Sequence, residues 1–159
     1  MSLNAKDIMR SPVVCADTKM SVSDLIKLLR EYGISGAPVL DDKGRLTGVV
    51  SGSDVVSKCG IFCDKVIPDH DFKRLPPFPE VTFSKGFHVE EYADSWVTEI
   101  MSSDVVAASP ETPLETLVDL MLTWRIHRIP IIEDDRPVGI VSSFDLLPFL
   151  EHQKTDLIQ

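Results

Sequence analysis

Apolar side chains recur with the period of a helix in two stretches of the chain, one in each half. The two sets begin at residues 22 and 114: Val22, Leu25, Ile26 and Leu29, then Leu114, Leu117, Val118 and Met121. Both follow the spacing i, i+3, i+4, i+7, which places their side chains on one face of a helix. The pattern therefore predicts two amphipathic helices that each bury one face.

Residues at the ends of these stretches agree with helix boundaries. Ser21 followed by Asp24 fits a capping box for the first helix, and Gly33 is expected to end it. For the second helix the expected cap is Thr112, with Pro113 in the first helical position.

Two hairpins are predicted from runs of apolar and β-branched residues that flank turn residues. Residues 37–40 and 46–50 enclose the turn DDKGR, and residues 129–132 and 138–141 enclose the turn EDDRP. The spacing of these runs predicts two antiparallel strand pairs, one in each half of the chain.

Each half begins with a short apolar pair and ends with a further helix. The pairs at 13–14 and 105–106 are expected to form short strands, and the last helices are expected to start near Ser51 and Ser142. Each half therefore follows the order strand, helix, strand, strand, helix.

The two halves form an internal repeat. KDIMRSPVV at 6–14 matches TEIMSSDVV at 98–106, and Pro38 matches Pro130, an offset of 92 residues (130 − 38). One unit is too small to bury its own sheet, whereas two units can share a core. We therefore expect an α/β (α+β) fold of two βαββα repeats, packed sheet to sheet about a pseudo-twofold axis.

The segment between the repeats departs from their pattern. It contains the run LPPFP and several phenylalanines, a mixture that indicates an ordered loop or short strand. The predicted domains are repeat one at 5–58, an inserted linker at 59–96 and repeat two at 97–152, and the two repeats together form one module. The sequence assigns no role to the linker; covering a cleft and being recognised by a partner are the two alternatives considered.

The composition narrows the possible functions. The net charge is −9, and no basic cluster is present that would neutralise the phosphates of a nucleic acid. No apolar run approaches the length of a membrane span, and the N-terminus shows no signal-peptide core. Three scattered cysteines fit a reducing compartment. The sequence thus predicts a cytoplasmic protein that binds neither nucleic acid nor membrane.

Residues 33–54 and 125–145 resemble the signature of the cystathionine-β-synthase (CBS) domain family. Each contains an apolar-Pro-apolar strand, a turn, a glycine with two apolar residues and S/T-x-x-D. The resemblance implies a compact, disc-like module with two clefts that hold AMP, ADP, ATP or S-adenosylmethionine. It further implies that the aspartate takes the ribose hydroxyls, that the serine lies near ribose or phosphate, and that adenine lies between apolar strand residues around Pro38 and Pro130.

The S-x-x-D motifs support two interpretations. Ser51 with Asp54, and Ser142 with Asp145, fit capping boxes in which the aspartate also favours the helix dipole. Both motifs, however, lead from a buried strand into a helix, where ligands often bind, and a carboxylate accepts two hydrogen bonds from a diol. We therefore expect at least one of the two aspartates to bind ribose. A proline three residues after Asp145 suggests that the last helix starts at Leu146 with Asp145 as its cap.

A basic turn is present in the second repeat only. Arg125, His127 and Arg128 align with glycine, serine and glycine of the first repeat. Such residues suit the C-terminal dipole of a helix, but arginine also offers a planar fork of donors to phosphate oxygens. Because the surrounding residues 97–150 carry three Lys/Arg against nine Asp/Glu, we favour a phosphate clamp. The two clefts are therefore expected to differ, and the clamp serves the ligand of Asp54, of Asp145, or of both.

Three functional hypotheses follow from the sequence. The favoured one is a regulatory module that binds an adenine nucleotide as a signal, requires no cofactor and controls a partner enzyme or transporter. The alternative is a protein-interaction or dimerisation module with unoccupied clefts. An enzyme ranks last, because the sequence shows no nucleophile–base pair, cofactor loop or zinc-ligand spacing. The apolar run at 144–150 predicts a homodimer.

Overall fold

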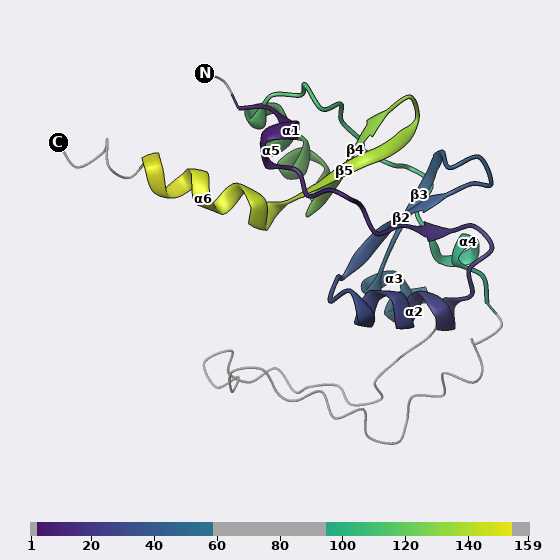
Figure 1. Ribbon diagram of the computed structural model, residues 1–159. Coiled ribbons are helices and arrows are strands. Elements are labelled where there is room, and N and C mark those ends of the chain that lie inside the picture. The colour runs from purple at the N-terminus through teal and green to yellow at the C-terminus, as the bar shows by residue number, and fades with distance from the viewer. Residues whose placement is uncertain (1–2, 59–94, 154–159) are drawn as a thin grey trace, which may run out of the picture.

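Two copies of one arrangement of helices and strands build the protein, as Figure 1 shows. The computed structural model describes residues 3–58 and 95–153, so the predictions for the linker lie almost wholly outside the described residues. The elements are, in chain order, α1 (Ala5–Ile8), β1 (Ala16–Asp17), α2 (Val22–Glu31), β2 (Gly36–Leu40), β3 (Leu46–Ser51), α3 (Gly52–Lys58), α4 (Val97–Ile100), α5 (Leu114–Trp124), β4 (Arg128–Glu133), β5 (Arg136–Ser142) and α6 (Ser143–Gln153).

The first amphipathic helix, α2, has the predicted ends. The Ser21 hydroxyl accepts a hydrogen bond from the Asp24 N–H at 3.1 Å, which satisfies one of the free N–H groups of the first turn. Gly33 has φ of +60°, the left-handed conformation that a glycine adopts without steric cost after a helix.

The start of the second amphipathic helix, α5, was predicted wrongly. Pro113 is the cap residue and the helix begins at Leu114, whereas the Thr112 hydroxyl accepts a hydrogen bond from the N–H of Ser109. The threonine therefore closes the turn before the helix. At the other end Arg125 has φ of +51°, so an arginine adopts the left-handed conformation at the position that aligns with Gly33.

Both predicted hairpins are confirmed, each with one strand register shift. β2 pairs with β3 through Pro38 opposite Val49, and β4 pairs with β5 through Pro130 opposite Ile140. The prediction of strands at 13–14 and 105–106 is wrong, because parallel pairing with the hairpin begins a few residues later in each repeat. It forms β1 in repeat one and a single bridge between Ala108 and Ile131 in repeat two.

The opening segment of each repeat packs on the other repeat. The N–H of Ala5 donates to the carbonyl of Thr112 at 2.8 Å, and the N–H of Val97 donates to the carbonyl of Met20 at 2.9 Å. Ala5 is buried in the core of repeat two, and Val97 is buried in the core of repeat one. This exchange ties the repeats together through their backbones, and the sequence pattern did not predict it.

Two glycines of the repeat signature are required by this exchange. A Cβ at Gly48 would lie 2.6 Å from the sulfur of Met101, and a Cβ at Gly139 would clash with the side chain of Met9. Each methionine follows one of the crossing helices, α4 or α1, and lies against a strand of the other repeat. A side chain at either glycine would therefore push the crossing segment off the sheet.

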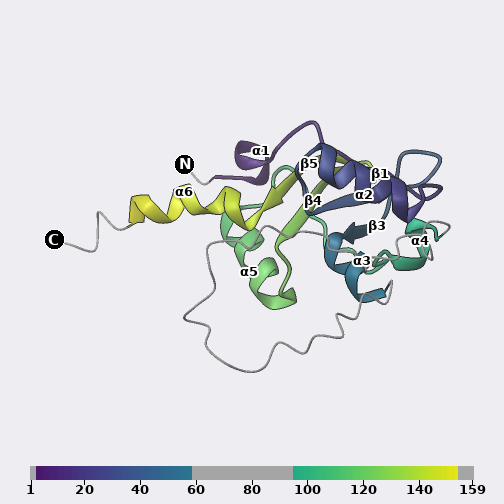
Figure 2. The same ribbon diagram turned by 90° about the horizontal axis from the view of Figure 1, so that it is seen from below.

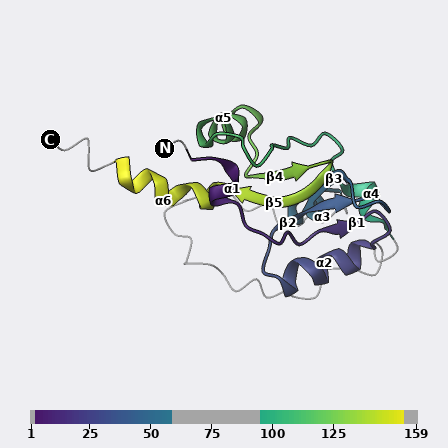
Figure 3. The same cartoon turned by 45° about the horizontal axis from the view of Figure 1, so that its top comes forward.

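The core consists of two apolar clusters, one in each repeat. Leu25 and Val39 are fully buried in the first cluster, and Leu117 and Ile129 are fully buried in the second. Figure 3 shows the two small sheets lying between α5 on one side and α2 on the other. The predicted α/β class with two packed repeats is thereby confirmed.

The last helix, α6, extends away from the rest of the molecule (Figures 1 and 2). It begins at Ser143, in agreement with the expected start near Ser142, whereas the expected start at Leu146 is wrong because Pro148 lies inside the helix. Across residues 3–58 and 95–153, none of the helices has the length and apolar character needed to cross a membrane.

Candidate functional site: two clefts between the repeats

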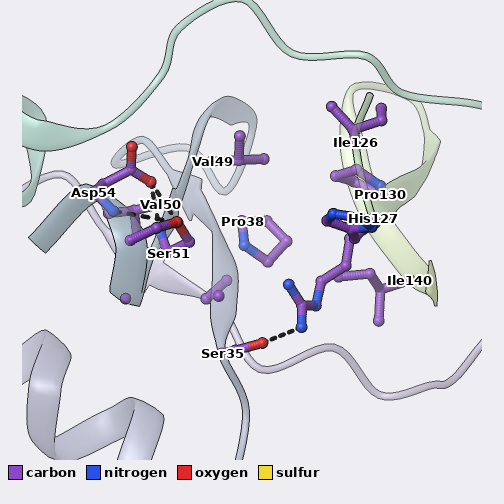
Figure 4. Close-up of a pocket in the computed structure, with 15 residues that line it drawn as sticks. Ser35, Pro38, Val49, Val50, Ser51, Asp54, Ile126, His127, Pro130 and Ile140 are labelled. Atoms are coloured by element: carbon purple, nitrogen blue, oxygen red, sulfur yellow. Dashed lines mark hydrogen bonds between the residues drawn. The ribbon is translucent and has the colours of Figure 1, made fainter. Parts of the chain in front are cut away.

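The first cleft, called cleft one, lies between β2–β3 of repeat one and β4–β5 of repeat two (Figure 4). Its volume is about 440 Å³. Its lining residues come from both repeats: Ser35, Gly36, Ala37, Pro38, Val49, Val50, Ser51, Gly52, Ser53, Asp54, Ile126, His127, Arg128, Pro130 and Ile140. The cleft is therefore complete only when the two repeats pack together.

Cleft one has apolar walls and a polar end. Figure 4 shows Pro38 and Val49 on one side and Pro130 and Ile140 on the other, while Asp54 lies beyond Val50 at one end. Flat or apolar groups can therefore enter between the two sheets, and the carboxylate of Asp54 lies at one end of the space that they would occupy.

Asp54 forms the expected capping hydrogen bonds. Its Oδ2 accepts hydrogen bonds from the Ser51 N–H at 2.8 Å and the Ser51 hydroxyl at 2.7 Å. These bonds fix the carboxylate at the start of α3. Its Oδ1 accepts no hydrogen bond from the described residues, so the capping interpretation and the ligand interpretation are compatible.

The second cleft, called cleft two, lies around the end of β5 and has a volume of about 530 Å³. Its lining residues are Arg10, Pro12, Val13, Val14, Gly33, Ile34, Ser35, Gly36, Arg128, Ile140, Ser142, Phe144 and Asp145. Val13 and Val14, which the sequence pattern assigned to a strand, line this cleft instead. Their apolar character is therefore explained by the cleft wall.

Asp145 is held in the same way as Asp54, with one addition. Its Oδ2 accepts hydrogen bonds from the Ser142 N–H at 2.8 Å and the Ser142 hydroxyl at 2.5 Å, so it lies in the first turn of α6 and is not its cap. Its Oδ1 accepts a hydrogen bond from Nε of Arg10 at 2.7 Å. Burial raises the pKa of Asp145, but the hydrogen bonds from Ser142 and Arg10 outweigh burial and lower it overall.

The three residues of the basic turn, Arg125, His127 and Arg128, lie in different places relative to the two clefts. Arg128 lines both of them, and its Nη2 donates a hydrogen bond to the Ser35 hydroxyl, drawn as the dashed line to Ser35 in Figure 4. His127 lines cleft one. Arg125 lines neither cleft and is exposed at the end of α5. The structure therefore brings Arg128 and His127 to the predicted site and leaves Arg125 outside it.

Sequence reasoning missed one charged residue of the site. Arg10 lies in the opening segment that crosses to repeat two, and its guanidinium reaches the carboxylate of Asp145. The signal was available, because the aligned residue of the second repeat is Ser102 (102 − 10 = 92). An arginine opposite a serine is an unlike pair within two otherwise similar segments.

Comparison with known proteins agrees with this architecture. The family model of the CBS domain matches residues 5–60 and again residues 97–152. An uncharacterized protein of Methanocaldococcus jannaschii is 31% identical over 157 residues, which cover 91% of this chain and 89% of that protein.

Two solved structures have the same fold. The CBS domain pair of protein MJ0100, in complex with 5′-methylthioadenosine and S-adenosyl-L-methionine, matches with a TM-score of 0.71 at 21% identity, over 96% of this chain and 99% of that one. The CBS domain of a CBS domain-containing membrane protein from Sphaerobacter thermophilus matches with a TM-score of 0.67 at 30% identity, over 92% of this chain and 87% of that one.

Proposed function

Because the chain belongs to the CBS domain family, we propose that it is a regulatory module that binds adenosine-containing nucleotides in its two clefts. The observation that carries the proposal is the pair of carboxylates, Asp54 and Asp145, each fixed by a serine at the end of an apolar cleft. AMP, ADP, ATP and S-adenosylmethionine all combine a flat aromatic base, a ribose diol and a charged group.

The chemistry of cleft one fits each part of such a ligand. Adenine would lie between the apolar walls around Pro38 and Pro130, and the ribose diol would donate to the free Oδ1 of Asp54. Arg128 and His127 would meet the phosphate. The volume of about 440 Å³ lies within the range of small-molecule sites, about 300–1,000 Å³. The ligands of protein MJ0100 are of the same adenosine-containing class.

The ligand acts as a signal in this proposal, and the chain catalyses no reaction and requires no cofactor. Each cleft is built by both repeats, so a ligand that contacts both walls favours the packing that forms the cleft. A partner enzyme or transporter that binds this chain would respond to the change in the packing of the repeats. The cytoplasmic location and the division into repeats at 5–58 and 97–152 with a linker at 59–96 stay predictions.

One observation favours a second candidate, an interaction module that works through its surface. In α6, Phe144 is 73% exposed and Leu147 is 50% exposed. A second copy of the chain would bury both side chains against their equivalents, as the predicted homodimer requires. This candidate needs no ligand, so ligand binding distinguishes the two.

A thermal-shift measurement tests the proposal. A ligand that binds only the folded protein raises the melting temperature by mass action. We expect AMP, ADP, ATP or S-adenosylmethionine to raise it, while guanosine monophosphate at the same concentration serves as the control. An unchanged melting temperature with every adenosine-containing ligand would leave the interaction module as the better account.

A further inference from the structure

The carboxylates of the two clefts, Asp54 and Asp145, differ in the hydrogen bonds that they accept. Oδ1 of Asp145 accepts a hydrogen bond from Nε of Arg10 at 2.7 Å, whereas Oδ1 of Asp54 accepts none from the described residues. The Arg10 side chain is 75% exposed, while that of Asp145 is 9% exposed. A solvent-facing cation therefore covers a carboxylate that is fixed in the cleft wall.

This difference comes from the side chain and not from the backbone. Arg10 exchanges two backbone hydrogen bonds with Ile140, at 2.9 and 3.1 Å, and Ser102 exchanges two with Val49, both at 2.9 Å. The two positions are therefore equivalent under the pseudo-twofold relation of the repeats. At this position the side chain beside repeat one is that of Ser102, and the side chain beside repeat two is that of Arg10.

We propose that Arg10 makes cleft two selective for phosphorylated nucleosides over unphosphorylated ones. The inference rests on the proposed function and names the ligand class of one of its clefts. A neutral nucleoside that binds Asp145 through its ribose competes with Arg10 for Oδ1 and gives the guanidinium no new partner. A phosphorylated nucleoside competes with Arg10 as well, but its phosphate oxygens accept the planar fork of donors in exchange.

The charges that line cleft two agree with this exchange. Arg10 and Arg128 bring two guanidinium groups to the cleft, against the single carboxylate of Asp145. Once the ribose occupies the carboxylate, both cations are available to phosphate. Cleft one has Arg128 but no counterpart of Arg10 among its lining residues, so it lacks this discrimination.

Calorimetric titration of adenosine and ADP tests the inference, with Asp54→Ala as the background so that the heat reports cleft two. In that background, Arg10→Ser places a serine next to cleft two, as Ser102 is the equivalent residue at repeat one. Adenosine affinity should rise by up to about fivefold, the upper end expected for loss of a largely exposed ion pair. ADP affinity should fall by about tenfold, because a charge-assisted contact is lost.

Two further variants serve as the matched control and the reciprocal test. Lys19→Ser removes an exposed lysine whose ion pair with Asp42 is 2.8 Å long and which lines neither cleft, and it should change neither affinity. Ser102→Arg, in an Asp145→Ala background, places an arginine before cleft one. It should lower adenosine affinity and raise ADP affinity there.

The outcomes separate the inference from the proposed function. If adenosine and ADP change in the same direction in Arg10→Ser, or neither changes, Arg10 does not select between them, although the clefts still bind adenosine. If neither ligand binds the wild-type protein, the proposed function itself is lost, and the inference with it. As a further readout, Arg10→Ser should raise the pKa of Asp145 followed by NMR, and an unchanged pKa would show that the ion pair does not form in solution.

Discussion

We expect replacement of Arg128 by alanine to weaken the binding of phosphorylated ligands while sparing adenosine. Arg128 is half-buried at the start of β4, lines both clefts, and is positioned by its hydrogen bond to Ser35. Its guanidinium is the cationic group that the two clefts share. No other described arginine lines cleft one.

The magnitude follows from the contact that is lost. A charge-assisted hydrogen bond to phosphate contributes about 1.5–3 kcal/mol, which corresponds to roughly ten- to a hundredfold in affinity. AMP and ATP should therefore bind about ten- to a hundredfold more weakly to Arg128→Ala. Adenosine has no phosphate, so its affinity should stay within about twofold of the wild-type value.

Calorimetry with adenosine and AMP, on the wild type and on Arg128→Ala, measures this difference directly. Arg136→Ala is the matched control, because Arg136 is an exposed arginine at the start of β5 that lines neither cleft. Equal losses for adenosine and AMP would mean that Arg128 shapes the cleft and does not bind phosphate. No loss for either ligand would refute the clamp altogether.

Three further predictions concern ribose binding, backbone strain and self-association. Asp54→Ala should lose adenosine affinity in cleft one while the protein stays folded, because the ribose loses its acceptor; a loss of about 1 kcal/mol of stability with unchanged adenosine affinity would assign Asp54 to capping alone. Arg125→Gly should raise the free energy of unfolding in urea titrations by up to about 1 kcal/mol, because it removes the steric strain of an arginine in the left-handed conformation. Gly33→Ala should lower the free energy of unfolding by a similar amount, and a destabilised Arg125→Gly would contradict this reasoning. Phe144→Ser should weaken self-association by about a hundredfold or more in analytical ultracentrifugation, because a symmetric dimer loses two copies of Phe144 at about 1.5–3 kcal/mol each. A monomeric wild type at tens of micromolar would exclude the homodimer.

The local elements were predictable from the sequence because local patterns determine them. The spacing of Leu25 and Leu117 on helical faces, the turn residues between the hairpin strands and Gly33 after α2 all express preferences of a few neighbouring residues. The fold class followed once the repeat was recognised, since one unit alone cannot bury its sheet.

The errors arose where another part of the molecule decides the conformation. Val13 and Val14 are residue types typical of a strand, but they line cleft two, and strand pairing with β2 begins only at Ala16. The exchange of α1 and α4 between the repeats depends on contacts between distant parts of the chain, such as Ala5 with Thr112, which no local window contains. The role of Arg10 was missed because its partner Asp145 is 135 residues away in the sequence, although the alignment of the two repeats already set Arg10 apart from Ser102.

Under the proposed function the two clefts are coupled, because they share Arg128. One guanidinium lines both cavities and rests on Ser35, which lines both as well. A phosphate in cleft one that draws Arg128 to itself removes a cation from cleft two, and the reverse holds equally, since a coupling free energy between two sites is reciprocal. Arg10 weakens this competition, because it supplies cleft two with a cation of its own. A second phosphorylated ligand should therefore bind more weakly than the first, whichever cleft fills first, and the gap between the two affinities should widen in Arg10→Ser.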